Sequence, residues 1–166
     1  YLLTSHRELS PALEVKNLRV PGMVQGVDLQ LYSGEIVGIS GLIGSGRTEL
    51  ARALFGMEEA SADTFRIDGR DTFPRSVQEA IKLGIAYVPE DRLSEGLFLS
   101  QPIERNMVVS ILDRLRRGLF LDRPSMRAKT NEMLASMQIV APSADTVVGD
   151  LSGGNAQRVM LGRWLL

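Results

Sequence analysis

The chain has 166 residues, of which 44% are hydrophobic and 23% are charged, and its formal net charge is −1. This composition is that of an ordinary globular protein, and the length is enough for one domain with a real core. A net charge this close to zero gives no overall electrostatic attraction to nucleic acid or to an anionic membrane. The absence of cysteine excludes disulfides and thiolate metal sites. No apolar run approaches the ~20 residues that a membrane-spanning helix needs.

Residues 1–12 are polar and include Pro11, which predicts a linker or tail. Leu13–Val20 and residues 27–31 alternate between apolar and polar side chains, the pattern of half-buried strands. The apolar run 35–40 predicts a buried strand that leads into a glycine-rich loop.

The glycine-rich loop has the spacing G-x-x-x-x-G-[K]-[ST] of a phosphate-binding loop, with arginine where lysine is usual. Its residues of interest are Gly41, Gly44, Ser45, Gly46, Arg47 and Thr48. Glycines allow turns that point backbone N–H groups into one concavity for an anion, and the following helix adds its positive end. Thr48 supplies a hydroxyl for Mg²⁺ beside the phosphates. The loop predicts a nucleotide site, the alternative being a glycine turn without a ligand.

Past the loop helix, residues 64–68 predict a strand and residues 77–83 a short helix. The apolar run 85–88 then predicts a second buried strand. From residue 103 to residue 137, apolar side chains recur at helical spacing with no strand signal, and we interpret the methionines of this block as core residues.

A second motif opens the last predicted helix. It consists of Leu151, Ser152, Gly153, Gly154 and Asn155. The glycines permit close backbone approach, and the serine can present its hydroxyl and the helix N-terminus to an anion. Alone, this segment is equally a simple helix start. The whole pattern predicts an α/β core over residues 13–92, a helical subdomain over 93–150, and a return to the core over 151–166.

From about residue 13 to its end, the chain resembles the ATP-binding subunits of ABC transporters, whose signature is L-S-G-G-Q. The segments 46–50, 87–92, 95–97 and 151–155 are similar to the second nucleotide-binding domain of importers for ribose, galactose and other simple sugars, including the autoinducer-2 type. The resemblance implies a P-loop NTPase fold of the ABC ATPase type. It also implies that the chain is a fragment of a longer polypeptide that stops before the Walker B strand.

The resemblance implies roles for particular residues. Residues 41–48 match the Walker A loop, which binds ATP and Mg²⁺, and Glu90 stands where most ABC ATPases have the Q-loop glutamine, so it is a tentative Mg²⁺ ligand and catalytic residue. Residues 151–155 match the signature, which contacts ATP held by the opposite domain. Arg47 and Glu90 depart from the usual residues, and the turn 21–26 lacks the aromatic residue that stacks on adenine. Walker B, the catalytic glutamate and the switch histidine would follow Leu166.

Three functions are consistent with these motifs. The first is an ATPase that drives sugar import, with a paired nucleotide-binding domain, membrane permease subunits and, indirectly, a solute-binding protein as partners, and no nucleic acid. This would place the chain at the cytoplasmic face of a bacterial membrane. The second is a non-catalytic module that completes the partner domain's ATP site. The third is an ABC protein without a transporter. We expect the 166 residues alone to bind nucleotide without hydrolysing it, and the strand 35–40 to be an aggregation-prone edge.

Overall fold

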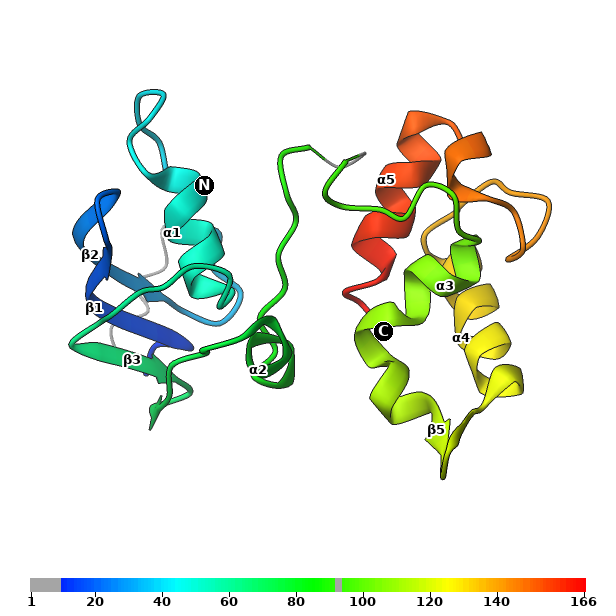
Figure 1. Cartoon of the computed structure of the whole chain (residues 1–166), viewed down its shortest axis with the longest axis horizontal. Helices are drawn as coiled ribbons and strands as arrows, with labels where there is room; N and C mark the ends of the chain where they lie inside the picture. Colours follow the sequence, from blue (N-terminus) through cyan, green and yellow to red (C-terminus); the bar gives the residue numbers. More distant parts are fainter. Residues whose placement is uncertain (1–9, 92–93) are drawn as a thin grey trace. The chain divides into compact units, whose positions relative to one another are not determined.

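The computed structural model describes residues 10–91 and 94–166, so the predicted tail falls largely outside the described residues. The chain divides into two compact units, the first ending at Tyr87 and the second beginning at Val88 (Figure 1). The first unit combines an antiparallel sheet with two short helices, and the second is mainly helical. Each unit has its own hydrophobic cluster.

The first unit is built on a four-stranded sheet with the order β2-β1-β3-β4 (Figure 1). Its strands are β1 (Leu13–Val20), β2 (Val24–Leu31), β3 (Thr64–Ile67) and β4 (Arg70–Asp71). All neighbours are antiparallel, which confirms the strands predicted from alternation at the start of the chain and at residue 64. Helices α1 (Arg47–Leu54) and α2 (Val77–Lys82) were also predicted.

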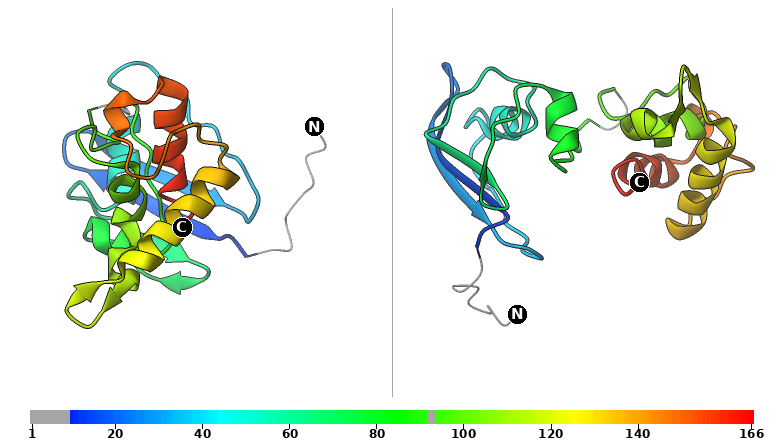
Figure 2. Two further views of the ribbon diagram at one scale, coloured as in Figure 1. Left: turned by 90° about the vertical axis from the view of Figure 1, so that its right-hand side faces the viewer. Right: turned by 90° about the horizontal axis from the view of Figure 1, so that it is seen from below.

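A bulge in β1 lets this strand bury side chains that simple alternation would separate. Asn17 adopts a left-handed backbone with φ 53°, and its N–H donates to the Asp28 carboxylate at 2.7 Å. The register with β2 shifts at this point, so Val15 and Leu18 are both buried although they lie three residues apart. Helix α1 covers this face with Leu50 (Figure 2, right).

Two predicted strands do not form. Residues 35–40 and 85–88 have no regular secondary structure, and no described strand pairs with either of them. The apolar side chains of 35–40 are exposed, with Ile36 at 97%, whereas in 85–88 Ile85 and Tyr87 are half-buried and Val88 is 44% exposed. An apolar run becomes a strand only when a neighbour satisfies its backbone groups, and a prediction from periodicity cannot supply that neighbour. The prediction of two buried strands was therefore wrong for this structure.

Within its described residues, the second unit contains three α-helices and shorter elements between them (Figure 1). In chain order these are α3 (Ile103–Val108), η1 (Val109–Leu115), β5 (Arg116–Arg117), β6 (Phe120–Leu121), α4 (Arg123–Ser136), η2 (Val148–Asp150) and α5 (Gly153–Gly162). The predicted helical block is confirmed, except that the small hairpin β5–β6 was missed. Its strands have two residues each, too short to produce an alternating pattern.

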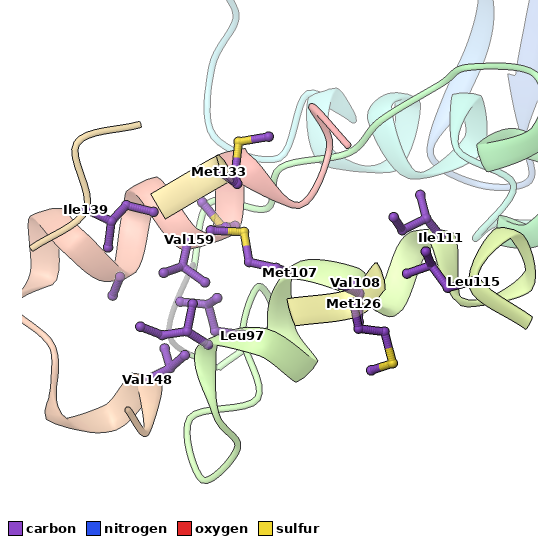
Figure 3. Packing of buried hydrophobic residues seen from close by; sticks show 13 residues of the cluster. Leu97, Met107, Val108, Ile111, Leu115, Met126, Met133, Ile139, Val148 and Val159 are labelled. Atoms are coloured by element: carbon purple, nitrogen blue, oxygen red, sulfur yellow. The ribbon is translucent and has the colours of Figure 1, made fainter. Parts of the chain in front are cut away.

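Methionines fill the core of the second unit, as predicted (Figure 3). Met107, Met126 and Met133 are buried among Ile, Leu and Val side chains of α3, α4 and α5. Gly162 lets these elements approach closely, because a Cβ there would lie 2.9 Å from Met133 Cγ and 3.0 Å from Met107 Cε. Helix α5 is thus held against both other helices by shape as well as by apolar burial.

Asn106 is a buried polar residue that holds this core to the chain around it. Its Oδ1 accepts from Phe98 N–H at 2.9 Å, and its Nδ2 donates to the carbonyls of Phe98 and Pro102 at 3.0 and 3.2 Å. The Arg163 guanidinium, at the end of α5, donates to the Asn106 carbonyl at 2.8 Å. Burial lowers the pKa of this arginine. One fully buried side chain therefore connects the segment before α3 with the far end of α5.

Replacing Asn106 with alanine is expected to lower the free energy of unfolding by about 3 kcal/mol, because the partly buried backbone groups of Phe98 and Pro102 lose their hydrogen-bond partner. Urea unfolding followed by circular dichroism measures the change. Asn131→Ala on the exposed side of α4 is the matched control and should stay within about 0.5 kcal/mol of the unchanged protein. Equal midpoints for the two variants would contradict this role.

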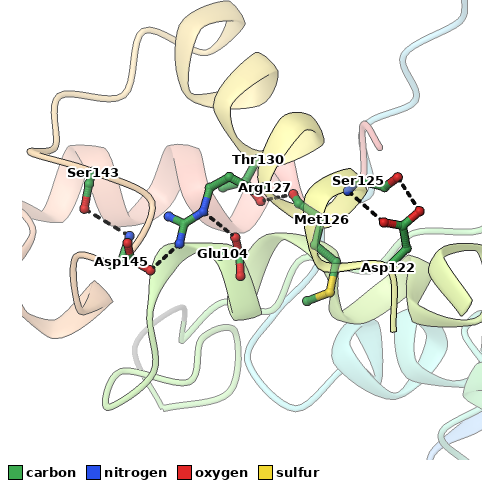
Figure 4. A network of polar contacts seen from close by, with 8 residues as sticks. All are labelled: Glu104, Asp122, Ser125, Met126, Arg127, Thr130, Ser143 and Asp145. Carbon is green, nitrogen blue, oxygen red and sulfur yellow. Dashed lines mark hydrogen bonds and ion pairs between the residues drawn. The ribbon is translucent and has the colours of Figure 1, made fainter. Parts of the chain in front are cut away.

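Polar contacts hold helix α4 against neighbouring segments and cap its start (Figure 4). Arg127 contacts both Glu104, at 2.9 Å, and Asp145, at 2.6 Å. At the start of the helix, the Asp122 carboxylate accepts from the Ser125 N–H at 3.2 Å and from its hydroxyl at 2.7 Å. These bonds to Ser125, followed by the nearby Arg117, hold the pKa of Asp122 below its usual value.

Because the pKa of Asp122 is lowered in the folded chain, its stabilising effect is complete above the unfolded value of about 3.9 and disappears as the pH falls through the lower folded value. Asp122→Asn should therefore unfold at a lower urea concentration than the unchanged chain at pH 7. The difference between the two midpoints should shrink as the pH approaches 2. Asp113→Asn, at an exposed 4.0 Å ion pair, is the control and should show a small difference throughout. If the difference in urea midpoint between Asp122→Asn and the unchanged chain stayed constant from pH 7 to pH 2, the stabilising role of the Asp122 carboxylate would be contradicted.

Candidate functional site

The glycine-rich loop lies between the extended segment 35–40 and helix α1, in the order that the sequence predicted. Gly44 and Gly46 have φ values of 81° and 85°, in the left-handed region that favours glycine. Between them the chain turns tightly, with the Ser45 N–H donating to the Leu42 carbonyl at 3.1 Å. Residues 41–45 are exposed, and the Ser45 N–H is already paired within the turn.

The three glycines of the loop are required for different reasons. A Cβ on Gly46 would lie 2.9 Å from the Met23 carbonyl oxygen, so this glycine lets the loop pack against the turn between β1 and β2. A Cβ on Gly41 would lie 2.6 Å from Ser45 Oγ. A Cβ on Gly44 would meet nothing within 4 Å, so only its backbone conformation requires glycine, and the space beside it is open to a ligand.

Helix α1 begins with the residues that the sequence analysis singled out for phosphate chemistry. Its N-cap is Gly46, and no side chain caps the N–H groups of the first turn. Arg47 is exposed and Thr48 is half-buried, directly at this end of the helix. An uncapped helix start with an adjacent guanidinium and hydroxyl has the donors that phosphate oxygens accept from. The residues present therefore fit a nucleotide phosphate group.

The turn between β1 and β2, which contacts the loop at Gly46, borders a pocket of about 670 Å³. Residues of the segment 19–25 line one side of this pocket, and residues 59–61 line the other. None of the described residues that line it is aromatic, in agreement with the absence of a stacking residue in the sequence. Any base bound beside this turn would rest on aliphatic and polar groups.

Glu90 and the signature segment belong to the second unit, whereas the phosphate loop belongs to the first. Glu90 is exposed and follows the buried Pro89. The next residue, Asp91, shapes a turn by accepting from the Ser94 N–H at 3.1 Å through its side chain. Arg92, part of the motif that carried the family resemblance, lies outside the described residues.

The signature segment forms the start of helix α5. Ser152 is the N-cap, and its hydroxyl accepts from the Asn155 N–H at 3.4 Å, which leaves the hydroxyl proton free to be donated. Gly153 and Gly154 are exposed, and a Cβ on Gly154 would meet nothing within 4 Å. Leu151 is half-buried and packs against the hydrophobic cluster of the unit. The backbone of this segment is open to an approaching group.

The side chain of Asn155 makes a contact that sequence reasoning missed. Its Oδ1 accepts from the Val140 N–H and its Nδ2 donates to the Val140 carbonyl, both at 3.1 Å. One turn later, Arg158 donates to the Gln138 carbonyl at 2.7 Å. The loop partners lie 15 and 20 residues away, and no local pattern in the sequence indicates such pairs.

Within the described ranges, no group of three or more histidine or acidic residues could hold a metal ion by itself. Of the helices that the structure describes, none combines the length and apolar character needed to cross a membrane.

Comparison with solved structures shows the fold. The ADP conformation of an ATP-binding cassette of an ABC transporter superposes with a TM-score of 0.69 at 21% identity, covering 95% of this chain and 65% of that one. Clostridium perfringens cbiO1, part of the ABC transporter complex cbiONQ, gives a TM-score of 0.68 at 19% identity, covering 93% and 61%. The arrangement of strands and helices is thus that of a P-loop ABC ATPase, of which this chain has a part.

Sequence relatives agree with this fold. The ribose import ATP-binding protein RbsA of Yersinia pestis is 40% identical over 153 residues, which are 92% of this chain and 30% of that protein. The galactose/methyl galactoside import ATP-binding protein MglA of Fusobacterium nucleatum is 41% identical over 157 residues, which are 93% of this chain and 31% of that protein. The chain thus spans about 30% of the length of these relatives. Residues 24–166 match the ABC transporter family, and the chain belongs to it.

Proposed function

We propose that this chain is the ATP-binding part of a sugar importer, in which nucleotide binding and hydrolysis by the whole protein drive transport. The observation that carries the proposal is the loop 41–48, where two glycines have a left-handed backbone, residues 41–45 are exposed and the following helix starts without a side-chain cap. The relatives at about 40% identity, which are named as ribose and galactose import proteins, support sugars as the transported class.

At the loop, the backbone N–H groups from Gly41 to Gly46 would surround the phosphates, and the first turn of α1 would add its positive end. Arg47 would contact the terminal phosphates with a planar, two-pronged guanidinium, where an ammonium is usual. Thr48 would hold Mg²⁺, which neutralises phosphate charge when it is bound. Glu90 would act at the Q-loop position, where its carboxylate can ligate a metal but cannot donate as an amide does.

The signature segment would act on a second nucleotide. Ser152 can donate its hydroxyl proton, and the exposed N–H groups of Gly153 and Gly154 lie beside it. We propose that these groups contact ATP held by a paired nucleotide-binding domain, as the family signature implies. We further propose that the chain is the second such domain of its protein and works with permease subunits at the cytoplasmic face of a bacterial membrane, with a solute-binding protein delivering the sugar.

A non-catalytic role for this domain's own site is the second candidate. Arg47 and Glu90 both replace residues that the family usually has at the phosphate and water positions. Phosphoryl transfer to water needs a positioned nucleophile as well as a phosphate clamp and a metal. In this alternative, the domain holds nucleotide and completes the active site of its partner.

Arg47→Ala is expected to weaken nucleotide binding by about 10- to 100-fold, the equivalent of one hydrogen bond to a charged group. Arg47→Lys should retain most of the affinity because it keeps the charge. Titration with a fluorescent ATP analogue in the presence of Mg²⁺ measures Kd for the complete domain. Arg70→Ala, on the exposed strand β4, is the matched control. A Kd unchanged in Arg47→Ala would exclude the loop as the nucleotide site.

The 166-residue chain should bind nucleotide without releasing phosphate, because it provides the clamp and one Mg²⁺ hydroxyl but no base beyond the signature. A malachite-green assay tests this, with Thr48→Ala as the control. Phosphate release that persists in Thr48→Ala would indicate a contaminating ATPase. Release that this substitution abolishes would show that the chain hydrolyses ATP itself and would refute the prediction.

A further inference from the structure

The last residue of the signature segment is engaged inside its own unit. The Asn155 carboxamide pairs with both backbone groups of Val140, as the backbone of an adjacent strand would. At the same time its backbone N–H donates to the Ser152 hydroxyl at 3.4 Å. Asn155 therefore connects the N-cap of α5 with a loop that lies 15 residues earlier in the chain.

The loop on which Asn155 rests has a fixed shape. Gln138 ends helix α4 with a left-handed backbone, φ 51°, and its carbonyl accepts from Arg158 at 2.7 Å. Ile139 is buried in the hydrophobic cluster, and its N–H donates to the Leu134 carbonyl at 2.9 Å. The Val140 backbone is thus held in place on both sides and gives the first turn of α5 a stable support.

The residues at the start of α5 that can contact a ligand are different from the residue that orients them. The exposed groups at the start of α5 are the Ser152 hydroxyl and the backbone of Gly153 and Gly154. The Asn155 side chain is half-buried, and each pole of its amide already has a partner. To reach a ligand, this amide would have to leave both backbone groups of Val140 unpaired.

We propose that Asn155 is a positioning residue, which sets the direction of the Ser152 hydroxyl and the adjacent N–H groups through Val140 and does not itself contact the nucleotide. The inference rests on the proposed function of the signature segment. The positioning role also accounts for the shorter side chain of asparagine, compared with glutamine, at position 155. The glutamine of the L-S-G-G-Q signature is longer by one methylene and would carry its amide beyond the Val140 backbone.

The experiment uses the full-length protein with three substitutions, Asn155→Asp, Asn155→Gln and Ser152→Ala. Asn155→Asp keeps the size but cannot donate to the Val140 carbonyl, and Asn131→Asp, on the exposed side of α4, makes the same chemical change as a control. Two quantities are measured: hydrogen exchange of the peptide that contains Val140, and the ATP dependence of hydrolysis.

Both Asn155 variants should speed exchange at Val140 and lower kcat by about 10- to 100-fold, the effect of misplacing a group that acts in the transition state. The KM for ATP should stay within about twofold, since the opposite domain holds most of the nucleotide. The Asn131→Asp control should change neither quantity.

Normal exchange at Val140 in Asn155→Asp would overturn the proposal. So would faster exchange with an unchanged kcat in the Asn155 variants, if Ser152→Ala still lowered kcat. Full activity of Asn155→Gln would also overturn it, because that result fits a direct contact in which glutamine replaces asparagine. If Ser152→Ala and both Asn155 variants all hydrolysed ATP normally, the proposed function of the signature would fail, and the positioning role would fail with it.

Discussion

The buried carboxamide of Asn106 is the constraint on which the second unit depends. It binds the backbone of Phe98 in both directions and receives the guanidinium of Arg163, so the segment before α3 and the end of α5 share one anchor. The opposite end of α5 is held in the same manner by Asn155 on Val140. Two asparagines thus fix the ends of the helix that presents the signature, Asn106 through the Arg163 guanidinium and Asn155 through the Val140 backbone.

The phosphate loop depends on backbone geometry more than on side chains. Only Gly44 is a glycine for conformation alone, whereas Gly46 is also needed because the Met23 carbonyl leaves no room for a Cβ. The contact at Gly46 ties the loop to the turn between β1 and β2, so the antiparallel sheet supports the helix start directly. A change of side chain at position 47, such as arginine in place of lysine, leaves this support intact, so the loop can keep its shape with either cation.

Elements that depend on local pattern were predicted from the sequence, and elements that depend on distant partners were not. The alternation of Leu13–Val20, the helix start at Arg47 and the serine N-cap of α5 all follow from neighbouring residues. The runs 35–40 and 85–88 have the composition of buried strands, but a strand needs a partner, and none of the described strands pairs with them. Motif spacing identified the loop and signature residues. It could not show that Asn155 contacts Val140, because that partner lies 15 residues away.

The methionines that surround Gly162 have a chemical consequence beyond packing. Met107 and Met133 place their thioethers and side-chain carbons against this glycine in the contact that seats α5. A sulfoxide oxygen at either position would be a polar group in a cluster of Ile, Leu and Val side chains, and it would push α5 away from its neighbours. The groups at the start of α5 would move with the helix, so oxidation of either methionine would disturb the signature segment although the chain has no cysteine.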